Sequence, residues 1–410
     1  MNKLSIAFKL KSFPNISETF VVHSIVSAID RGYDVTILVD KVNSLSNSSL
    51  PDLVQQYGLM EKVRLYTEPK GKINRIFRAF FILLIPGTPK YFNRLRSYRK
   101  KTTLSFLFKL AFYKKLRKTD TFHVHFADNL GPLMALKKIG YLKSNFVVTF
   151  HGYDAHYFPS KNENPKYFRQ FEETVDHITV NSGYLKNLLL TKGFLSDYIN
   201  VIPVGIDTNQ FSAPPKALPK NNWKLLNVGR LIPLKGQEQG IRVVKLLIDR
   251  GYNVSLTIVG AGPLKHSLST LINSLGLENV VKLVGEKSQL AIKELLTNHH
   301  LFLMTSTLDE EGRREAFGLV SLEAQSMGVP VIGFDSGGFP ETMLKDKTGL
   351  IVPDTDIKAM AQAIELCILQ PEVWLEMSRC APGFVVQNFS KEVISKQYHA
   401  LYQNLMANMI

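Results

Sequence analysis

The chain has 410 residues but few cysteines and no recognisable signal peptide, two features that would indicate a secreted protein. Its two cysteines, Cys367 and Cys380, lack CxxC spacing, which predicts free thiols in a reducing compartment and argues against metal bound by cysteine. Lys9 and Lys11 interrupt the first apolar residues, so the start does not resemble a signal peptide. We therefore expect a cytoplasmic protein rather than a disulfide-rich secreted one.

Motifs for several ligands are also missing. There is no RNP motif, zinc finger or helix-turn-helix, so no nucleic-acid partner is expected. The glycine-rich fingerprint G-x-G-x-x-G is absent, so NAD is not predicted. No Asp-x-Asp motif is placed to hold a metal ion. We expect neither a cofactor nor a metal.

Acidic residues are absent from one long stretch. The chain has 50 Lys and Arg against 35 Asp and Glu, and fifteen of the cations lie between Lys70 and Lys118, where no acid occurs. The whole net charge of +15 thus belongs to this basic segment, residues 70–118. Such a local excess favours one anionic partner over a generally basic surface.

The basic segment is also rich in aromatic residues, with ten between Phe77 and Tyr113. Its apolar run, 79–85, is far shorter than the ~20 residues of a bilayer span. Prolines and a glycine at 86–89 predict two helices, near 72–85 and 88–118. Cations beside apolar residues suit the anionic surface of a membrane. The alternative is a solvated basic face over an ordinary core.

The remainder alternates short apolar runs with helical periodicity, which predicts parallel sheets covered by helices. Ile248–Ser255 (IDRGYNVS) repeats the pattern of Ile29–Thr36 (IDRGYDVT), in which a helix ends at a glycine and a strand begins. This echo favours two Rossmann-like α/β domains. The proline-rich stretch 212–222 is the predicted linker between them.

Two cations open the second domain. A predicted strand, 224–229, ends in a glycine and is followed by Arg230 and Lys235. Arg230 can bind phosphate with a fork of donors, and Lys235 adds a point charge. Helix N-termini prefer acids, so two cations there indicate an anionic ligand. The alternative is a helix start with exposed basic residues.

Glu315 and Glu323 stand eight positions apart on either side of an apolar run opened by Gly318. We predict a helix over Phe317–Met327, whose first amides would suit a phosphate. Carboxylates would repel that phosphate, so they make sense if they face sugar and ribose hydroxyls. The alternative is an amphipathic helix with one capping and one exposed glutamate.

His151 follows a predicted strand, 145–150, in the first domain. Ligands of open α/β sheets lie beyond the carboxyl ends of the strands, which makes His151 a candidate site residue. The alternative is a structural histidine in a turn. His123 and His125 are predicted to be strand residues, of which one could face the ligand.

Together these motifs resemble the retaining family 4 glycosyltransferases, and the resemblance covers nearly the whole chain. The segments that carry it are Ser17-Glu-Thr-Phe20, His151-Gly-Tyr-Asp154, Gly229-Arg-x4-Lys235-Gly236, Gly260-Ala-Gly-Pro263, Gly285-Glu-Lys287, Glu315-x7-Glu323 and Ser336-Gly-Gly-Phe-Pro-Glu341. The SETF segment is similar to the start of enzymes that build exopolysaccharide, colanic acid and lipopolysaccharide. Where relatives have a short proline-bearing stretch, this chain has a longer charged loop, 305–315.

The resemblance implies a GT-B fold, two Rossmann-like domains facing across a cleft that holds the donor. The implied domains are an acceptor-side domain at 1–211, the linker at 212–222, a nucleotide-sugar domain at 223–385, and a C-terminal helix at 386–410 that returns to the first domain. The implied roles are catalytic for His151 and Glu315; diphosphate binding for Arg230, Lys235, Gly318, Leu319 and Val320; ribose binding for Glu323; and base binding for Gly260, Glu286 and Lys287.

The expected activity is metal-independent retaining transfer of a sugar from a nucleotide diphosphate sugar, with UDP favoured and GDP possible. The expected acceptor is a growing, lipid-linked surface polysaccharide, reached from the cytoplasmic face of the inner membrane. One alternative is another enzyme of the same fold, such as a nucleotide-sugar epimerase or a phosphorylase, although no lysine is recognisable as a pyridoxal phosphate site. Another is a non-catalytic protein of the membrane surface.

Overall fold

The computed structural model describes residues 3–16, 18–98 and 103–407, which form two compact units. Unit 1 holds the described residues of Met1–Val180, Lys186–Ile202 and Ser395–Ile410, and unit 2 holds Asn181–Leu185 and Pro203–Ile394. The limits differ from the expected ones, because residues 203–211 lie in unit 2, where Phe211 is buried in a core cluster. The C-terminal residues join unit 1 from Ser395 onward.

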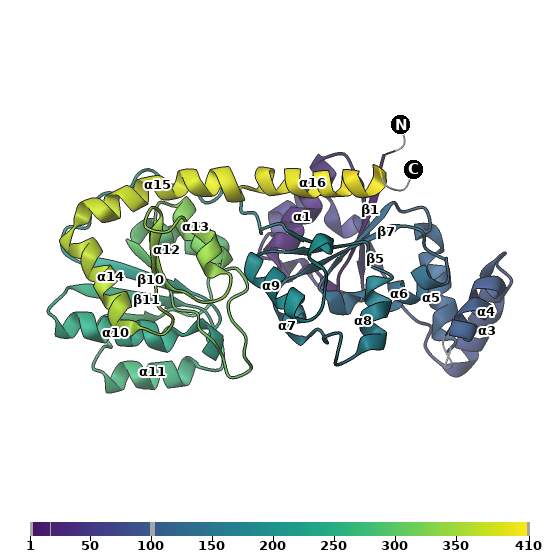
Figure 1. Ribbon diagram of the computed structural model, residues 1–410, viewed down its shortest axis with the longest axis horizontal. Coiled ribbons are helices and arrows are strands. Elements are labelled where there is room, and N and C mark those ends of the chain that lie inside the picture. Colours follow the sequence, from purple (N-terminus) through teal and green to yellow (C-terminus); the bar gives the residue numbers. More distant parts are fainter. Residues whose placement is uncertain (1–2, 17, 99–102, 408–410) are drawn as a thin grey trace. The chain divides into compact units, whose positions relative to one another are not determined.

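Unit 1 is built on a seven-stranded parallel sheet in the order β5-β3-β1-β6-β7-β8-β9 (Figure 1). Its strands are β1 Ser5–Lys9, β3 Asp34–Val39, β5 Val63–Leu65, β6 Thr121–His125, β7 Asn145–Phe150, β8 His177–Val180 and β9 Ile199–Val201. A separate two-stranded sheet pairs β2 Ser12–Phe13 with β4 Lys41–Val42. β6 and β7 are buried throughout, as strands covered on both faces must be.

Helices connect these strands. They are α1 Thr19–Asp30, α2 Pro51–Gln56, α3 Lys72–Leu83, α4 Thr88–Tyr98, α5 Ser105–Tyr113, α6 Gly131–Lys138, α7 Tyr153–Tyr157, α8 Pro165–Glu172 and α9 Gly183–Thr191. The last helix, α16 Lys391–Ala407, ends in unit 1, where Tyr402 Oη lies 2.6 Å from His123 Nδ1 and Asn145 donates to the Leu405 carbonyl.

In its described residues, the basic segment contains three α-helices rather than two. The predicted helix at 72–85 corresponds to α3, but the predicted single helix at 88–118 is wrong, because Thr103 and Leu104 lie outside any helix between α4 and α5. The break allows α5 to bury Phe106, Leu107 and Leu110 while it contacts both α3 and α4. One straight helix could not bury them in this way. The cations at 99–101 lie outside the described residues.

Unit 2 has a six-stranded parallel sheet in the order β12-β11-β10-β13-β14-β15. The strands are β10 Trp223–Val228, β11 Val254–Val259, β12 Val281–Leu283, β13 Leu301–Met304, β14 Val331–Phe334 and β15 Gly349–Val352. The helices are α10 Gln237–Asp249, α11 Lys265–Ser274, α12 Gln289–Asn298, α13 Leu319–Ser326, α14 Ile357–Leu369 and α15 Pro371–Phe389. The strand order reverses between β10 and β13, the position at which Rossmann-like sheets bind ligands.

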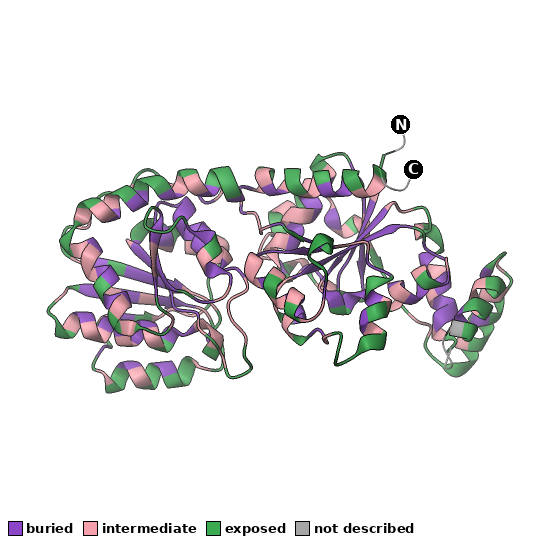
Figure 2. Cartoon of the chain, viewed as in Figure 1, coloured by how far each residue is buried: buried purple, intermediate pink, exposed green. Residues whose placement is uncertain are grey.

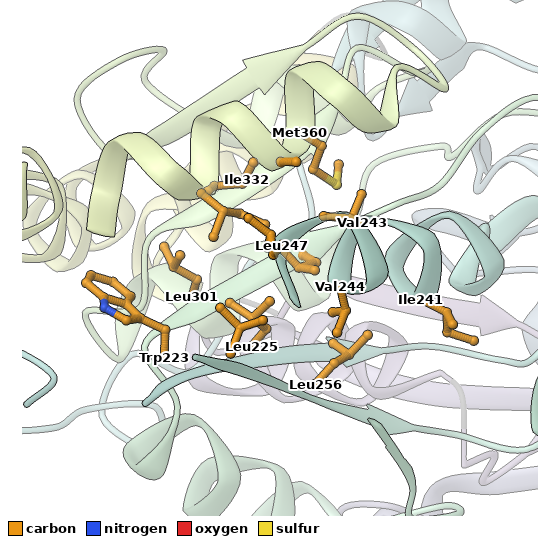
Figure 3. Packing of buried hydrophobic residues seen from close by; sticks show 14 of the residues in the cluster. Trp223, Leu225, Ile241, Val243, Val244, Leu247, Leu256, Leu301, Ile332 and Met360 are labelled. Atoms are coloured by element: carbon orange, nitrogen blue, oxygen red, sulfur yellow. The ribbon is translucent and has the colours of Figure 1, made fainter. Parts of the chain in front are cut away.

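The core of unit 2 lies between this sheet and the helices α10 and α14. Figure 3 shows Leu225 and Leu256 of adjacent strands packing toward Val244 and Leu247 of α10, with Met360 of α14 beside them. The α10 residues repeat at helical spacing, and all five side chains are at most 1% exposed. This packing fixes the strand ends from which the candidate site is built.

The repeated sequence at 29–36 and 248–255 forms the same junction in both units. Gly32 and Gly251 each have φ near +84°, and their amides donate to the carbonyls of Ile29 and Ile248 at 2.9 Å. β3 and β11 begin just afterwards. The predicted fold class, two Rossmann-like α/β units, is therefore confirmed. Within the parts of the chain that the structure describes, no helix is long and apolar enough to traverse a bilayer.

Candidate functional site

The candidate donor residues of unit 2 lie where β10 and β13 end. Gly229 and Arg230 follow β10, and the loop that leads to Glu315 follows β13. These strands are neighbours in the sheet, with Leu226 opposite Phe302. Because parallel strands end at one edge, side chains that are eighty positions apart in sequence come together at the topological switch point.

Lys235 and Glu315 form an ion pair at this edge, in which Lys235 Nζ donates to Glu315 Oε2. Their side chains are 18% and 12% exposed. Burial opposes ionisation of Glu315, but the charge and hydrogen bond of Lys235, with a further bond from Ser306, hold the pKa of the carboxyl below its ordinary value. Glu315 is therefore ionised, although it is largely out of water.

Arg230 is exposed, and within the described chain no carboxylate pairs with its guanidinium. Its charge nevertheless contributes to lowering the Glu315 pKa, so it lies on the same side of the site as Lys235. The unpaired guanidinium offers several N–H donors to an anion, whereas the ammonium of Lys235 already uses one donor for Glu315.

The loop between Arg230 and Lys235 is held by polar side chains that belong to none of the sequence motifs. Asn227 donates to Thr305 Oγ1 at 3.1 Å, and Thr305 donates to the Lys235 carbonyl at 2.8 Å. Gln237, which is buried, donates to the Arg230 carbonyl at 3.0 Å. Ser306 donates to Glu315 Oε2 at 3.1 Å. The position of Thr305 and Ser306 directly after a buried strand could have indicated that these two residues lie at the site.

Helix α13 begins at Leu319 rather than at the predicted Phe317. Gly318 precedes it with φ of +92°, a left-handed conformation that ends the incoming loop. A side chain at Gly318 would also come within 3.0 Å of Met304. The amides of Leu319 and Val320 are in the first turn, where N–H groups have no partner within the helix. These two amides can therefore bind an anion.

Glu323, on the second turn of α13, is only 6% exposed. Within the described residues its carboxylate has no hydrogen-bond or ion-pair partner, and burial alone raises its pKa to about 8. The alternative of an exposed surface glutamate is therefore wrong. An unpartnered buried carboxyl of this kind is suited to accept hydrogen bonds from ligand hydroxyls.

Two glycines fix the backbone at Glu315. The Gly338 amide donates to the Glu315 carbonyl at 2.8 Å. A Cβ at Gly337 would lie 2.1 Å from the Glu315 carbonyl oxygen, and one at Gly338 would lie 2.2 Å from that of Ala316. Arg314, the residue before Glu315 in the charged loop 305–315, forms an ion pair with Asp354. These contacts hold Glu315 in place.

The candidate base-binding residues lie at the ends of β11 and β12. Gly260 donates from its amide to the Gly285 carbonyl at 2.9 Å, which brings its turn beside Glu286 and Lys287. Glu286 and Lys287 are exposed. A Cβ at Gly260 would meet the Gly229 carbonyl oxygen at 1.9 Å, so this glycine is required by packing alone. The base-binding role of all three stays a prediction.

In unit 1, His151 follows β7 and lies in a group of rings. Its Nε2 atom is 3.0 Å from His125 Nδ1, and its ring centroid is 4.5 Å from those of Phe20 and Phe126. Asp154 accepts hydrogen bonds from the amides of His151 and Ala127, which fixes the turn. Ser17, the first residue of the SETF segment, lies outside the described residues.

The three histidines of this group are neutral. Burial lowers the pKa of His125 to about 3 and moves the pKa values of His123 and His151 well below the ordinary value. Neutral His125 and His151 share one proton between Nδ1 and Nε2, so each ring fixes the tautomer of the other. A direct role of His151 at the sugar stays a prediction.

Comparison with known proteins identifies the class. Residues 17–210 match the family described as Glycosyltransferase Family 4, and residues 209–381 match the one described as Glycosyl transferases group 1. With the fold and the arrangement in unit 2, these consecutive matches show that the chain belongs to the family 4 glycosyltransferases of the GT-B fold.

Full-length relatives have 27–29% identity to the chain. The putative colanic acid biosynthesis glycosyltransferase WcaL of Escherichia coli is 27% identical over 98% of this chain and all of the relative. The amylovoran biosynthesis glycosyltransferase AmsK of Erwinia amylovora is 29% identical with the same coverage. The crystal structure of Anabaena Alr3699/HepE in complex with UDP is 18% identical, with a TM-score of 0.73 over 98% of this chain and all of that chain.

Proposed function

We propose that the protein transfers a sugar, with retention of configuration, from a nucleotide diphosphate sugar to a growing surface polysaccharide. The observation that carries the proposal is the placement of Arg230 and Lys235 beside Glu315 at the switch point of unit 2. A protein of the same fold has been crystallised with UDP, which supports a nucleotide diphosphate sugar as the donor, and we favour a UDP-sugar. The two full-length relatives are named for colanic acid and amylovoran biosynthesis, which favours an exopolysaccharide acceptor.

The proposed chemistry is mainly electrostatic. As the bond from sugar to diphosphate breaks, negative charge builds on the leaving group, and the Arg230 guanidinium can offset it. Lys235 has donors to spare beyond its bond to Glu315. The first amides of α13 add further donors. Such preorganised stabilisation commonly contributes about 3–4 kcal/mol for one donor.

The two acids would bind alcohols. We propose that Glu315, ionised and held by Ser306, accepts a hydrogen bond from a hydroxyl of the donor sugar. Glu323 would accept hydrogen bonds from the ribose hydroxyls, which would satisfy a carboxyl that is otherwise unpartnered. His151 of unit 1 would contact the donor sugar, as the family motif implies, and the leaving phosphate would take the acceptor proton. No added metal would be needed.

The proposed acceptor is linked to a lipid at the cytoplasmic face of the inner membrane. The support is the activity of the two full-length relatives together with the basic segment of unit 1. The acceptor's sugar sequence and the linkage formed are open to a screen.

The direct test is a panel of UDP- and GDP-sugars incubated with purified protein in the presence of a metal chelator. We expect slow hydrolysis of one donor, and release of the sugar with its anomeric configuration kept, as followed by NMR. Glu323→Gln and Lys235→Ala should abolish it, whereas Lys358→Ala, an exposed residue of α14, should not. Conversion to another nucleotide sugar without release would indicate an epimerase, and no turnover would favour a non-catalytic protein.

A further inference from the structure

Helix α3 carries an apolar stripe that the rest of unit 1 leaves uncovered. Six side chains of α3 and its C-terminal cap are between 52% and 86% exposed, namely Ile73, Ile76, Phe77, Phe80, Phe81 and Leu84. Their spacing of three, one, three, one and three positions places them on one side of the helix. The only buried residue of α3 is Ala79. Exposed apolar patches of this kind mark interaction sites.

The stripe is separate from the side on which α3 packs. Arg75 donates to Ser105 of α5 at 2.8 Å and forms an ion pair with Glu68, so the side of the helix that carries Arg75 and Ala79 faces the protein. The rings of Phe77 and Phe81 contact each other, with centroids 4.8 Å apart. In Figure 1, α3 and α4 lie at the end of unit 1 beyond α5, and Figure 2 shows both helices largely exposed.

Exposed cations occur on α3, just before it and at the start of α4. Lys70, Lys72, Arg78 and Lys90 are exposed, and none has an ion pair within the described residues. Acids are absent from the whole of residues 70–118. A second copy of the chain is a poor occupant of this face, because two strongly positive segments would meet. An anionic surface that also accepts apolar side chains fits both features.

We propose that α3 lies in the plane of an anionic bilayer surface, with its six exposed apolar side chains at the acyl boundary and the flanking cations at the headgroups. A helix of twelve residues is too short to span a membrane, but it suits this interfacial position. The purpose of such attachment, to bring the enzyme to a lipid-linked acceptor, rests on the proposed function. The attachment itself does not.

Vesicle flotation tests the proposal with the full chain. We expect binding to vesicles of equal parts phosphatidylcholine and phosphatidylglycerol, weakened by salt, and little binding to phosphatidylcholine alone. Phe77→Ser with Phe80→Ser should abolish flotation. The matched control replaces two exposed leucines of unit 2, Leu290→Ser with Leu369→Ser, and should float like the wild type. Lys72→Ala and Arg78→Ala should each weaken binding to the anionic vesicles about fivefold.

A fluorescent probe tests the depth of insertion. Both native tryptophans, Trp223 and Trp374, lie in unit 2 and are at most 7% exposed, so they should not respond to lipid. In Phe80→Trp, the new emission should shift to shorter wavelength on anionic vesicles and be quenched by brominated acyl chains. Leu290→Trp should show neither effect.

Three outcomes would overturn the inference: no binding by the wild type, equal binding by the double phenylalanine variant, or equal binding to neutral vesicles. A dimer that the double variant dissociates, without vesicle binding, would assign the stripe to a second copy instead. Since the substituted side chains are exposed, far-ultraviolet circular dichroism should be unchanged and confirm folding. Vesicle binding without donor hydrolysis would reject the proposed function but keep this inference.

Discussion

The Lys235 ammonium donates to the Glu315 carboxylate across the carboxyl ends of two adjacent strands. One partner is proposed to bind the diphosphate and the other a sugar hydroxyl, so the pair sets the spacing between those two parts of the donor. It also explains how Glu315 stays ionised at 12% exposure of its side chain. Arg230, which has no such partner within the described residues, keeps its full charge for the ligand.

Removing either partner of this pair should be more harmful than removing both. Lys235→Met leaves a largely buried carboxylate without its cation, which typically costs about 3–5 kcal/mol of the free energy of unfolding. Adding Glu315→Gln should restore much of that loss while activity stays abolished. Urea unfolding followed by the fluorescence of Trp223 and Trp374 gives the stability of unit 2. If the separate effects of Lys235→Met and Glu315→Gln on the free energy of unfolding add up in the double variant, the pair is not coupled.

Gly338 should be needed for the position of Glu315 rather than for chain flexibility. Its Cβ would lie 2.2 Å from the Ala316 carbonyl oxygen, so Gly338→Ala should shift the loop, lower kcat/KM and cost about 1–3 kcal/mol of stability. Gly383 of α15 is the matched control, because a Cβ there meets nothing within 4 Å. Gly383→Ala should stabilise the protein by about 0.5–1 kcal/mol. Full activity in Gly338→Ala would contradict this account of the loop.

Much of the scaffold could be predicted because buried parallel strands are short apolar runs. The predicted strand at 145–150 has the limits of β7, Asn145–Phe150, and the one predicted at 224–229 differs from β10, Trp223–Val228, by one residue at each end. The break between α4 and α5 was missed, because it depends on tertiary packing of α5 that local periodicity does not record.

The sequence indicated the candidate site residues but not the contacts among them. The sequence indicated Lys235 and Glu315 separately, but their ion pair joins positions eighty residues apart and needs the adjacency of β10 and β13. Among the described residues Glu323 has no partner, and this depends on what surrounds α13, which spacing cannot show. Thr305 and Gln237 were missed because their role is to hold backbone carbonyls of the 230–235 loop.

Acid should destabilise unit 1 through its buried histidines. The pKa of His125 is about 3, below its ordinary value, so its contribution to stability is present above pH 6.5 and is lost as the pH falls toward 3. Between about pH 6.5 and pH 4 the loss from this one group should be on the order of 3 kcal/mol.

The comparison variant is His125→Gln, which does not titrate but keeps a donor and an acceptor beside His151. Its free energy of unfolding should fall less steeply with acid than that of the wild type. Hydrogen exchange in β6 and β7 reports on unit 1 specifically. If the free energy of unfolding falls equally steeply with acid in the wild type and in His125→Gln, then His125 does not resist protonation in the folded state.

Glu323 should make unit 2 sensitive to alkaline pH. Its pKa is raised from an ordinary 4.5 to about 8 by burial, so the stability it contributes is complete below pH 4.5 and lost as the pH rises through 8. Relative to Glu323→Gln, the wild type should lose on the order of a few kcal/mol between about pH 5 and about pH 9. Tryptophan fluorescence during urea unfolding at each pH measures this difference.

Nucleotide binding should lower the raised pKa of Glu323. Ribose hydroxyls that donate to Glu323 favour its ionised form, so UDP binding near pH 7 should expel a proton from a carboxyl that is protonated in the free protein. Calorimetry in buffers of different ionisation enthalpy detects that proton. Glu323→Gln should bind UDP more weakly without releasing one, while Glu294→Gln, on the exposed part of α12, should behave as the wild type. Proton release that persists in Glu323→Gln would remove Glu323 from the ribose site.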